Sequence, residues 1–386
     1  MKIVLDKTTF LDKLSPCMGT VSTKNTISSI EGILIETVDA ENVRISSYDM
    51  NKGVRITFEA IEIIESGSCI INAQKLFQIV KLMPEDEVTI EVDEKYNASI
   101  YSGKSSFSLF SLRGTEFPSL PELYGDKGFE IKAGVLKKMI TKVINSVAEQ
   151  DSRPMLCGAF FKIEENSLEI VSCDSYTLSK CNVNYELRDI GDISALNFSF
   201  IIPGHALSEM IKILPDKDED VNVFLSRKHA IVKIRDIVFF TRMIDSEYID
   251  YKRIIPTSQT IFVKVNRERM LRGLERAILV AEDKVQGSAR SYVKIGIKGN
   301  VFSLTSTSVN GKVYDEMDCT HEGADIEIGF NCRFLINSIR VAEGENIRIT
   351  MKAPTQAITV EPTEKSEEFS YFYMILPVRM NESQAK

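Results

Sequence analysis

The chain has 386 residues and a formal net charge of −8, with 44% hydrophobic and 26% charged residues. This composition is typical of a soluble globular protein of about two to three domains. No apolar run of about 18 residues is present, and residues 1–6 resemble a strand rather than a signal peptide, so we expect a cytoplasmic protein without a membrane partner. The seven cysteines are scattered and never in C-x-x-C spacing, which favours buried thiols in a reducing compartment.

Three segments spaced roughly 130 residues apart carry the same pattern. Each begins with an apolar pair, continues into an amphipathic helix and ends in an acidic turn, at residues 70–86, 201–217 and 328–345. The spacing is too long for a solenoid unit and matches the size of a domain. A chain that repeats a whole domain is expected to build a symmetric object.

In chain order, apolar periodicity predicts six helices, at about 7–19, 72–83, 134–147, 203–214, 265–281 and 331–342. Leu136, Met139, Ile140 and Val143 show the helical spacing i, i+3, i+4, i+7. Segments such as 88–92, 168–171 and 347–350 alternate with period two, as half-buried antiparallel strands do. Each repeat is therefore expected to be an α+β unit with two helices on one face of antiparallel sheets.

Charge is distributed unevenly between the helices and the remainder of the chain. The six predicted helices contain 14 basic and 4 acidic residues, although the whole chain is acidic. Basic helix faces are common for solubility alone. Their restriction to equivalent helices of a repeat favours a surface that attracts a polyanion without reading its sequence.

Residues that would carry catalysis are scattered. There is no Gly-rich phosphate loop, no G-x-S-x-G and no H-E-x-x-H. His205, His229 and His321 fall in different contexts, without metal-ligand spacing. Asp174 could be a nucleophile, but Asp49 recurs at the same place in the first repeat, which favours a hydrogen bond within a turn. We expect no enzyme activity, no metal and no cofactor.

Several stretches resemble one known family, the bacterial β sliding clamps, which are the β subunits of DNA polymerase III. They are residues 107–120, 150–158, 250–256, 276–279 and, most specifically, Leu376-Pro377-Val378-Arg379-Met380. The resemblance extends from Met1 to Met380. It implies three clamp-type domains at 1–125, 126–256 and 257–380, with 381–386 as a disordered tail. It also implies antiparallel sheets outside, two helices per domain inside, and a head-to-tail homodimer that forms a ring.

The function implied by the resemblance is that of a DNA sliding clamp at the nucleoid. The ring would encircle double-stranded DNA without sequence specificity and hold the replicative DNA polymerase for processivity. The polymerase, the clamp loader and repair proteins would dock through short linear peptides between the second and third domains. Carried over position by position, that peptide site comprises Arg153, Leu156, Cys173, Ser175, Tyr176, Thr177, Leu178, Ile249, Arg253, Ile254, Thr355, Ala357, Leu376, Pro377, Val378 and Arg379.

The chain departs from the family pattern inside this predicted site. Tyr176 and Thr177 stand where the family often has His-Arg, and Ile249 stands where a proline is common. These changes alter the polarity of the site. Without the resemblance, Leu156 and Leu178 would equally suit an ordinary core.

Two further sets of residues follow from the resemblance. The dimer interface is expected at Phe107 and Leu109 of one subunit against Leu279 and Val280 of the other. The DNA-facing residues, by resemblance and charge, are Lys24, Lys75, Lys81, Lys137, Lys138, Lys142, Gln150, Arg269, Arg272, Arg276 and Lys284. An alternative is a monomeric three-domain interaction scaffold with non-specific DNA affinity.

Overall fold

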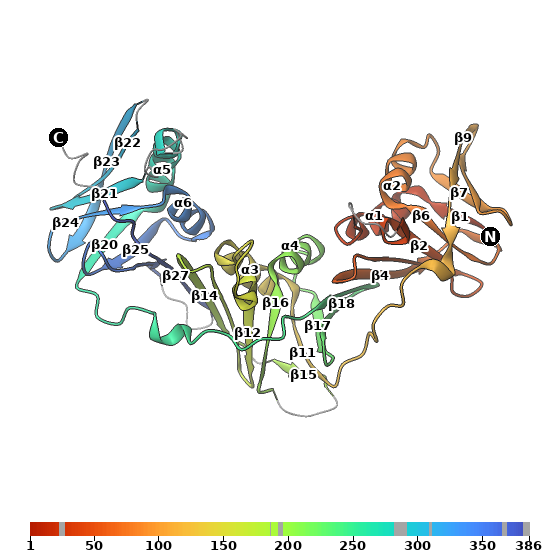
Figure 1. Ribbon diagram of the computed structural model, residues 1–386, viewed down its shortest axis with the longest axis horizontal. Coiled ribbons are helices and arrows are strands. Elements are labelled where there is room, and N and C mark those ends of the chain that lie inside the picture. Colours follow the sequence, from red (N-terminus) through yellow and green to blue (C-terminus); the bar gives the residue numbers. More distant parts are fainter. Residues whose placement is uncertain are drawn as a thin grey trace. The chain divides into compact units, whose positions relative to one another are not determined.

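The computed structural model describes residues 1–22, 28–185, 187–191, 196–281, 292–308, 311–364 and 369–380. Its contacts divide the chain into two compact units. The first comprises Met1–Lys137, Leu187–Leu196 and His205–Met243, and the second comprises Lys138–Glu186, Asn197–Gly204 and Ile244–Lys386. In both units helices pack on antiparallel sheets (Figure 1).

The described residues contain six α-helices, in the places that the apolar periodicity predicts. They are α1 (Lys7–Cys17), α2 (Ala73–Leu82), α3 (Ala133–Val143), α4 (Gly204–Ile213), α5 (Arg267–Ala281) and α6 (Cys332–Val341). Four begin directly after a strand at a side-chain cap, in which Asp6, Asn72, Asn266 or Asn331 accepts a hydrogen bond from a backbone N–H of the first turn. Within their units, α1 packs on α2 and α5 packs on α6.

The first unit contains two sheets. One has the order β5 (Glu62–Glu65), β1 (Lys2–Asp6), β7 (Glu87–Val92), β8 (Asn97–Ser102) and β9 (Ser105–Phe110). The other has the order β10 (Leu112–Arg113), β6 (Ser68–Asn72), β2 (Gly32–Thr37), β3 (Asn42–Tyr48), β4 (Lys52–Glu59), β19 (Ile237–Arg242), β18 (His229–Ile234), β17 (Asp220–Leu225), β11 (Lys127–Lys132) and β15 (Arg188–Asp189).

The second unit contains one long sheet. Its order is β16 (Phe198–Pro203), β12 (Gly158–Glu164), β13 (Ser167–Cys173), β14 (Thr177–Asn184), β27 (Phe369–Ile375), β26 (Ile358–Pro362), β25 (Asn346–Met351), β20 (Ile261–Asn266), β23 (Lys312–Glu322), β22 (Val301–Thr307), β21 (Val293–Lys298) and β24 (Ile326–Phe330).

Two strand pairings join consecutive repeats, and we call them the first and second seams. At the first seam β4 pairs with β19, and at the second seam β14 pairs with β27, both antiparallel. In each case a middle strand of one repeat pairs with the last strand of the next. The sheets therefore continue without a break from one repeat into the following one.

Residues of β14 alternate between the two faces of the sheet at the second seam. Thr177 and Ser179 face the helix side, where both hydroxyls contact Ser146 after α3, at 2.9 and 2.6 Å. Leu178, between them, is fully buried on the opposite face. Leu156, Cys173 and Ala357, which are also predicted to bind peptide, are buried in the same cluster as Leu178.

Candidate functional site

The predicted peptide-binding residues all lie in the second unit, and five of them belong to one apolar cluster or pack against it. Leu156, Cys173, Leu178 and Ala357 are buried there with Val171, Tyr251 and Met374, and Ile249 packs against them. Leu156 comes from a 3-10 turn before β12, Cys173 and Leu178 from the β13–β14 hairpin, and Ala357 from the loop before β26. The structure thus brings together side chains that are distant in sequence.

The β13–β14 turn shapes one edge of this cluster. Asp174 accepts hydrogen bonds from the backbone N–H of Tyr176 at 2.9 Å and of Thr177 at 2.6 Å, and Ser175 adopts a φ of 77°. Asp49 makes the same pair of bonds in the first repeat, to the N–H groups of residues 51 and 52. Asp174 is therefore a turn-forming carboxylate, as the repeat predicts.

Exposed and charged side chains form the rim of the cluster. The Arg153 guanidinium donates to both carboxylate oxygens of Asp151, at 3.0 and 3.1 Å, and to the Ser175 hydroxyl at 2.5 Å. These Arg153 bonds lower the pKa of Asp151 to about 2. Arg253 pairs with Asp250 at 2.8 Å. Arg153 and Arg253 are thus each held by a neighbouring aspartate.

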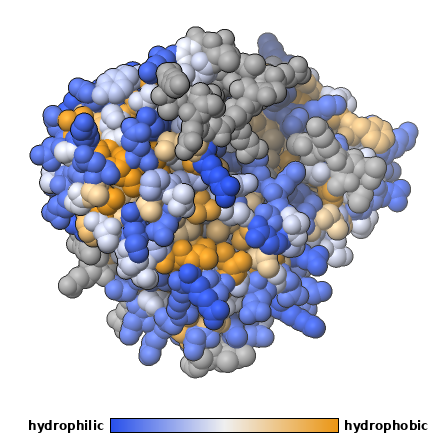
Figure 2. Space-filling model, turned by 60° about the vertical axis from the view of Figure 1, so that its left-hand side comes forward, coloured by the Kyte–Doolittle hydropathy of each residue, from blue (hydrophilic) through white to orange (hydrophobic). Residues whose placement is uncertain are grey.

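The chain after β27 completes the rim. The Leu376 N–H donates to the Tyr176 carbonyl oxygen, and the Val378 N–H donates to the Gly329 carbonyl oxygen. Pro377 and Val378 are half-buried, while Arg379 and, in the loop before β26, Thr355 are exposed. Leu376 and Ile254 remain substantially exposed although they are aliphatic. On the face drawn in Figure 2, hydrophobic side chains likewise gather in restricted areas bordered by hydrophilic ones.

One aromatic neighbour was missed by the sequence analysis. Tyr176, which is 54% exposed, stacks on Phe334 of α6 with ring centroids 5.9 Å apart and planes 25° apart. Phe334 follows the N-cap of α6 by three residues, so it lies in the first turn and points away from the helix core. The sequence feature that could have indicated Phe334 is an aromatic residue that falls outside the buried apolar stripe of α6.

The residues predicted to face DNA fall into four groups. Lys75, Lys81 and Gln150 are exposed. Arg269, Arg272 and Arg276 of α5 are also more than half exposed, and each is near an acidic side chain: Asp318, Glu268 and Asp315. Lys24 and Lys284 lie outside the described residues.

Lys137, Lys138 and Lys142 of α3 are engaged within the protein. Lys137 pairs with Asp216 at 2.9 Å. Lys138 and Lys142 both pair with Glu343, at 2.9 and 2.8 Å. Lys142 is only 3% exposed, and its ammonium lies 4.4 Å from the centre of the Tyr371 ring. In this arrangement Lys142 cannot contact DNA, because the α6 end and β27 cover it.

Burial shifts the pKa values of Lys142 and Glu343 in this group of charged residues, which also includes Lys138. Burial lowers the pKa of Lys142, an effect that Glu343 partly offsets. Burial alone would raise the pKa of Glu343, but hydrogen bonds from Lys142 and Lys138 outweigh it and lower that pKa. The cluster is a structural junction between the second and third repeats.

The predicted interface residues are accessible. Phe107 on β9 is exposed and Leu109 is half-buried. Leu279 on α5 is 75% exposed, and Val280 beside it is half-buried. Exposed apolar side chains on an edge strand and a helix end are typical of a surface that a partner covers.

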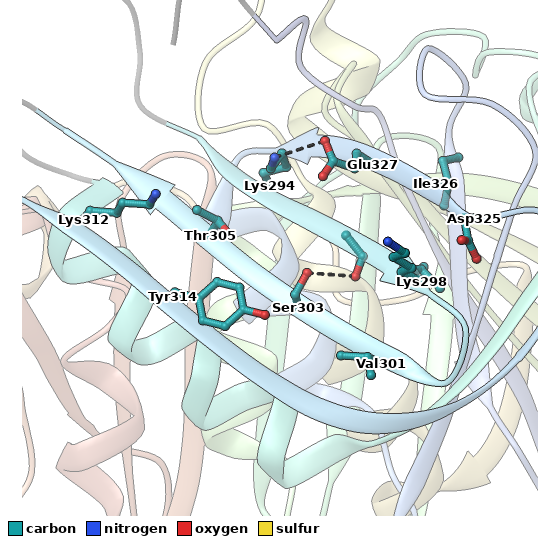
Figure 3. A pocket seen from close by; sticks show the side chains of 12 residues that line it. Lys294, Lys298, Val301, Ser303, Thr305, Lys312, Tyr314, Asp325, Ile326 and Glu327 are labelled. Atoms are coloured by element: carbon teal, nitrogen blue, oxygen red, sulfur yellow. Dashed lines mark hydrogen bonds and ion pairs between the residues drawn. The ribbon is translucent and has the colours of Figure 1, made fainter. Parts of the chain in front are cut away.

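A groove that the sequence did not indicate lies on the sheet of the third repeat (Figure 3). Its volume is about 720 Å³, and its floor is formed by small residues, Gly296 and Ser303, which face each other on β21 and β22. Lys294 on its wall pairs with Glu327 at 3.0 Å. The groove is polar and open, unlike the apolar cluster at the second seam.

Within the described ranges, no group of three His, Cys, Asp or Glu side chains is placed to hold a metal ion. None of the helices in those ranges is both long and apolar enough to cross a membrane.

Comparison with known proteins matches the chain repeat by repeat. Residues 1–121, 130–250 and 252–379 match the N-terminal, central and C-terminal domains of the DNA polymerase III beta subunit. The chain is 26% identical to the beta sliding clamp of Staphylococcus epidermidis, over 98% of this chain and 99% of the relative. The DNA polymerase sliding clamp of Bacillus subtilis has the same fold with a TM-score of 0.89, at 26% identity, over 99% of this chain and 100% of that one. The beta subunit of Streptococcus pyogenes gives 0.88 at 25% identity, over 98% and 100%.

The fold and these matches define a DNA sliding clamp, a class of processivity factor that is not catalytic. The chain belongs to the family of bacterial DNA polymerase III β subunits, the β sliding clamps. The expected α+β fold of three clamp-type domains is confirmed.

Proposed function

We propose that two copies of this chain associate head to tail into a ring that encircles duplex DNA and tethers the replicative polymerase. Each copy would contribute three domains, at 1–125, 126–256 and 257–380, and the ring would act in the cytoplasm at the nucleoid. Such a ring holds DNA by topology, so each phosphate contact can stay weak and exchangeable.

The observation that carries this proposal is a pair of open strand edges. In the described residues β9, the strand of the first repeat that corresponds to β19 and β27, pairs only with β8. Residues 312–318 of β23, the equivalent in the third repeat of β4 and β14, pair only with β22. These are the two kinds of strand that join at both seams within the chain. Pairing β23 of one copy with β9 of the next would form a third seam of the same kind and remove both edges.

DNA contact would come mainly from helix faces. Lys75, Lys81 and Gln150 are exposed in the structure and remain in the proposed set, with Arg269, Arg272, Arg276, Lys137 and Lys138 as ion-paired members. An ion pair at the surface is worth at most about 1 kcal/mol, so these side chains can exchange an acidic partner for a phosphate. Lys24 and Lys284 stay proposals on resemblance alone.

The apolar cluster at the second seam supports docking of short peptides from the polymerase, the clamp loader and repair proteins. It joins buried apolar walls to exposed anchors, Tyr176, Ile254 and Leu376, and to rim cations, Arg153 and Arg253. An extended peptide gains affinity by placing a few side chains on such a surface, while polar groups at the rim fix its orientation.

A topology experiment tests the ring. The protein is loaded on a nicked circular DNA with a bacterial clamp loader and ATP, washed in high salt, and the circle is then cut once. Survival on the circle with release from the linear product is the expected result. Loss from both forms in salt would contradict encirclement and favour the monomeric scaffold with electrostatic DNA affinity.

Solution mass separates the same alternatives. The ring requires about twice the 43.5 kDa of the chain, whereas the scaffold would remain at 43.5 kDa. Sedimentation across a concentration series measures this directly.

A further inference from the structure

We propose that the sheet face opposite the helices at the first seam binds an extended acidic peptide segment of a partner protein. The site is a line of side chains that crosses the strands, together with three cations, Arg44, Arg55 and Lys233. It belongs to the first unit, whereas the peptide site proposed at the second seam belongs to the second. The inference does not depend on formation of a ring.

Strand pairing places the side chains of the site in one line, which we call the outer row. Across β3, β4 and β19, Ser46 pairs with Arg55 and Arg55 pairs with Val238. The line continues across β18 and β17, from Val238 to Lys233 and then to Asn222. Residues that pair directly across neighbouring strands point to the same face of a sheet. The outer row is therefore one continuous strip of surface.

The outer row faces away from the helices. On β4, Phe58 points to the helix side, where it stacks on Phe10 of α1 with ring centroids 6.1 Å apart. Successive residues of a strand alternate between the faces, so Arg55, three positions before Phe58, points to the other side. Arg44 shares that side, because its Nε donates at 3.3 Å to the hydroxyl of Thr57, its partner on β4. Arg44 thus lies beside Arg55, diagonally across two strands.

The charges of these cations are not balanced nearby. In the described part of the chain no ion pair joins Arg44 or Arg55 to a carboxylate, although Glu36 lies opposite Arg44 on β2. The Lys233 ammonium lies 4.9 Å from the centre of the Phe224 ring. Burial lowers the pKa of Arg55, the charge of Arg44 lowers it further, and Glu36 only partly offsets both effects. An anion on this face would stabilise both guanidinium groups.

The second seam shows how the same positions are neutralised within the chain. Residues 169 and 171 pair with 182 and 180, just as residues 44 and 46 pair with 57 and 55. Glu169 and Lys180 therefore occupy the places of Arg44 and Arg55, and they form an ion pair. With an arginine in the place of the acidic member, the first seam has two cations where the second seam has a pair of opposite charges.

Hydrogen bonding along the outer row is also incomplete. Ser46 Oγ, Arg55 Nε and Asn222 Oδ1 are buried without a hydrogen-bond partner in the described residues. Buried polar atoms of folded proteins nearly always have such a partner. Three of the seven unpartnered atoms found in the described residues fall on this one line of five residues. The row is thus a polar surface that its own chain leaves unsatisfied.

The segment between the first and second repeats borders the outer row (Figure 1). Gly114 at one end lies against β2, and Gly125 at the other end lies against β17. Between them, Leu120 and Leu123 pack on the apolar cluster that Val238 of the outer row also contacts. An extended segment already crosses this face beside the row, and a second one lying next to it would cover the row itself.

The chemistry of the row favours an acidic peptide over a nucleic acid. Arg55 and Lys233 are two strands apart, about 10 Å, and the half-buried apolar Val238 lies between them. An extended peptide can offer carboxylates to the cations and an apolar side chain to Val238. A single nucleic-acid strand needs accessible rings for stacking. Here Phe240 is fully buried and Phe224 is covered by Lys233.

Peptide binding tests the proposal. The probe is a fluorescein-labelled decapeptide of alternating Glu and Val, and fluorescence anisotropy gives its Kd. Arg44→Glu builds at the first seam the ion pair of the second seam, so thermal unfolding should not be lowered. Its Kd should rise about tenfold or more, because a carboxylate then opposes the acidic peptide. Arg55→Gln, which keeps most of the side-chain length without the charge, should also raise Kd by about tenfold.

Lys298→Glu is the matched control, because it makes the same change of charge at an exposed lysine of the third repeat. Its Kd should stay within about twofold. Removal of residues 376–386 takes away one wall of the site at the second seam and should also leave the Kd of this probe unchanged.

Four results would overturn the proposal. The first is an unaltered protein that does not bind the probe. The second is an equal loss in Lys298→Glu, which would mean attraction by charge alone. The third is a loss on removal of residues 376–386, which would place the probe at the second seam. The fourth is decathymidylate that binds as tightly as the peptide with the same dependence on Arg44, which would assign the row to a nucleic acid.

Discussion

Arg153 occupies a fixed position at the rim of the candidate peptide site. Its guanidinium forms a two-pronged hydrogen bond to Asp151, a geometry that orients a planar cation more strongly than a single contact does. The same guanidinium donates a hydrogen bond to the hydroxyl of Ser175, the residue before Tyr176 in the β13–β14 turn. A peptide would therefore meet a cation whose direction is already set, which reduces the entropy lost on binding.

This arrangement predicts an unusual titration. Hydrogen bonds from Arg153 lower the pKa of Asp151 to about 2. A lowered carboxyl pKa means that the Arg153–Asp151 contact is intact above about pH 4 and is lost as the pH falls toward 2. Carboxyl carbon shifts in NMR should place the midpoint near 2. With Arg153→Ala, the midpoint should return toward the ordinary value for aspartate; a normal midpoint in the unaltered protein would contradict the contact.

Tyr176 provides a second prediction at this scale. Replacing Tyr176 with Ala removes an exposed ring that stacks on Phe334, without opening the buried cluster. An aromatic contact is worth about 0.5–1.5 kcal/mol, so affinity for a polymerase-derived peptide should fall roughly 3- to 10-fold. Fluorescence anisotropy of a labelled peptide measures this. Tyr314→Ala, on the groove of the third repeat, should bind the peptide like the unaltered protein, and equal losses in both variants would argue against a specific site.

Among the elements, α3 links the second repeat to the third. Lys142 on α3 is covered by the end of α6 and by Tyr371 of β27, and it shares Glu343 with the more exposed Lys138. The two lysines therefore serve as a matched pair, one inside the junction and one at its edge.

The pair predicts unequal effects on stability. Lys142→Ala removes the buried aliphatic part of the lysine side chain and leaves Glu343 with one ion-pair partner, Lys138, instead of two. The free energy of unfolding should therefore fall by about 1–3 kcal/mol. Lys138→Ala removes a surface ion pair and should cost less than about 1 kcal/mol. Urea unfolding followed by circular dichroism gives both values. Equal losses would mean that burial of Lys142 does not stabilise the junction.

The same elements indicate how far the sequence could predict the structure. The six helices follow from local periodicity, because an apolar stripe needs only the residues of its own helix. The burial of Lys142 does not, because its cover comes from residues 341–343 and 371, two hundred positions away in the chain. Likewise, the alternation of β14 predicts a strand but not that β27 is its partner. The peptide-site residues were located by resemblance, whereas Phe334 required the three-dimensional arrangement.

At the scale of the whole molecule, the open strand edges on β9 and β23 offer a way for two copies to associate. In the described part of the chain, the two seams leave one edge of each kind, on β9 and on β23, and the proposed head-to-tail dimer would pair them twice. Such a heterologous contact closes a ring when the rotation per subunit is a half turn.

The double variant Phe107→Ala with Leu109→Ala tests the edge of β9. Both side chains lie on the strand that would pair with the second copy, and truncation removes about 2 kcal/mol or more of apolar contact at each seam. The dimer Kd from sedimentation should rise by more than tenfold. The same double change should leave peptide binding at the second seam unaltered, since β9 belongs to the other unit. An undiminished dimer at micromolar concentration would refute this interface.

Removing residues 376–386 separates the two proposed activities. β27 ends at Ile375, so its pairing with β14 is retained, while the Leu376 and Val378 backbone bonds and the apolar segment between them are lost. Peptide affinity should fall below detection, because one wall of the site is gone. The dimer should persist. It should also be retained on circular DNA when it is first mixed with a linearised plasmid, onto which a ring can thread, and the plasmid ends are then ligated. Peptide binding that survives the truncation would place the site elsewhere, and loss of the dimer would show that the second seam and the contact between copies are coupled.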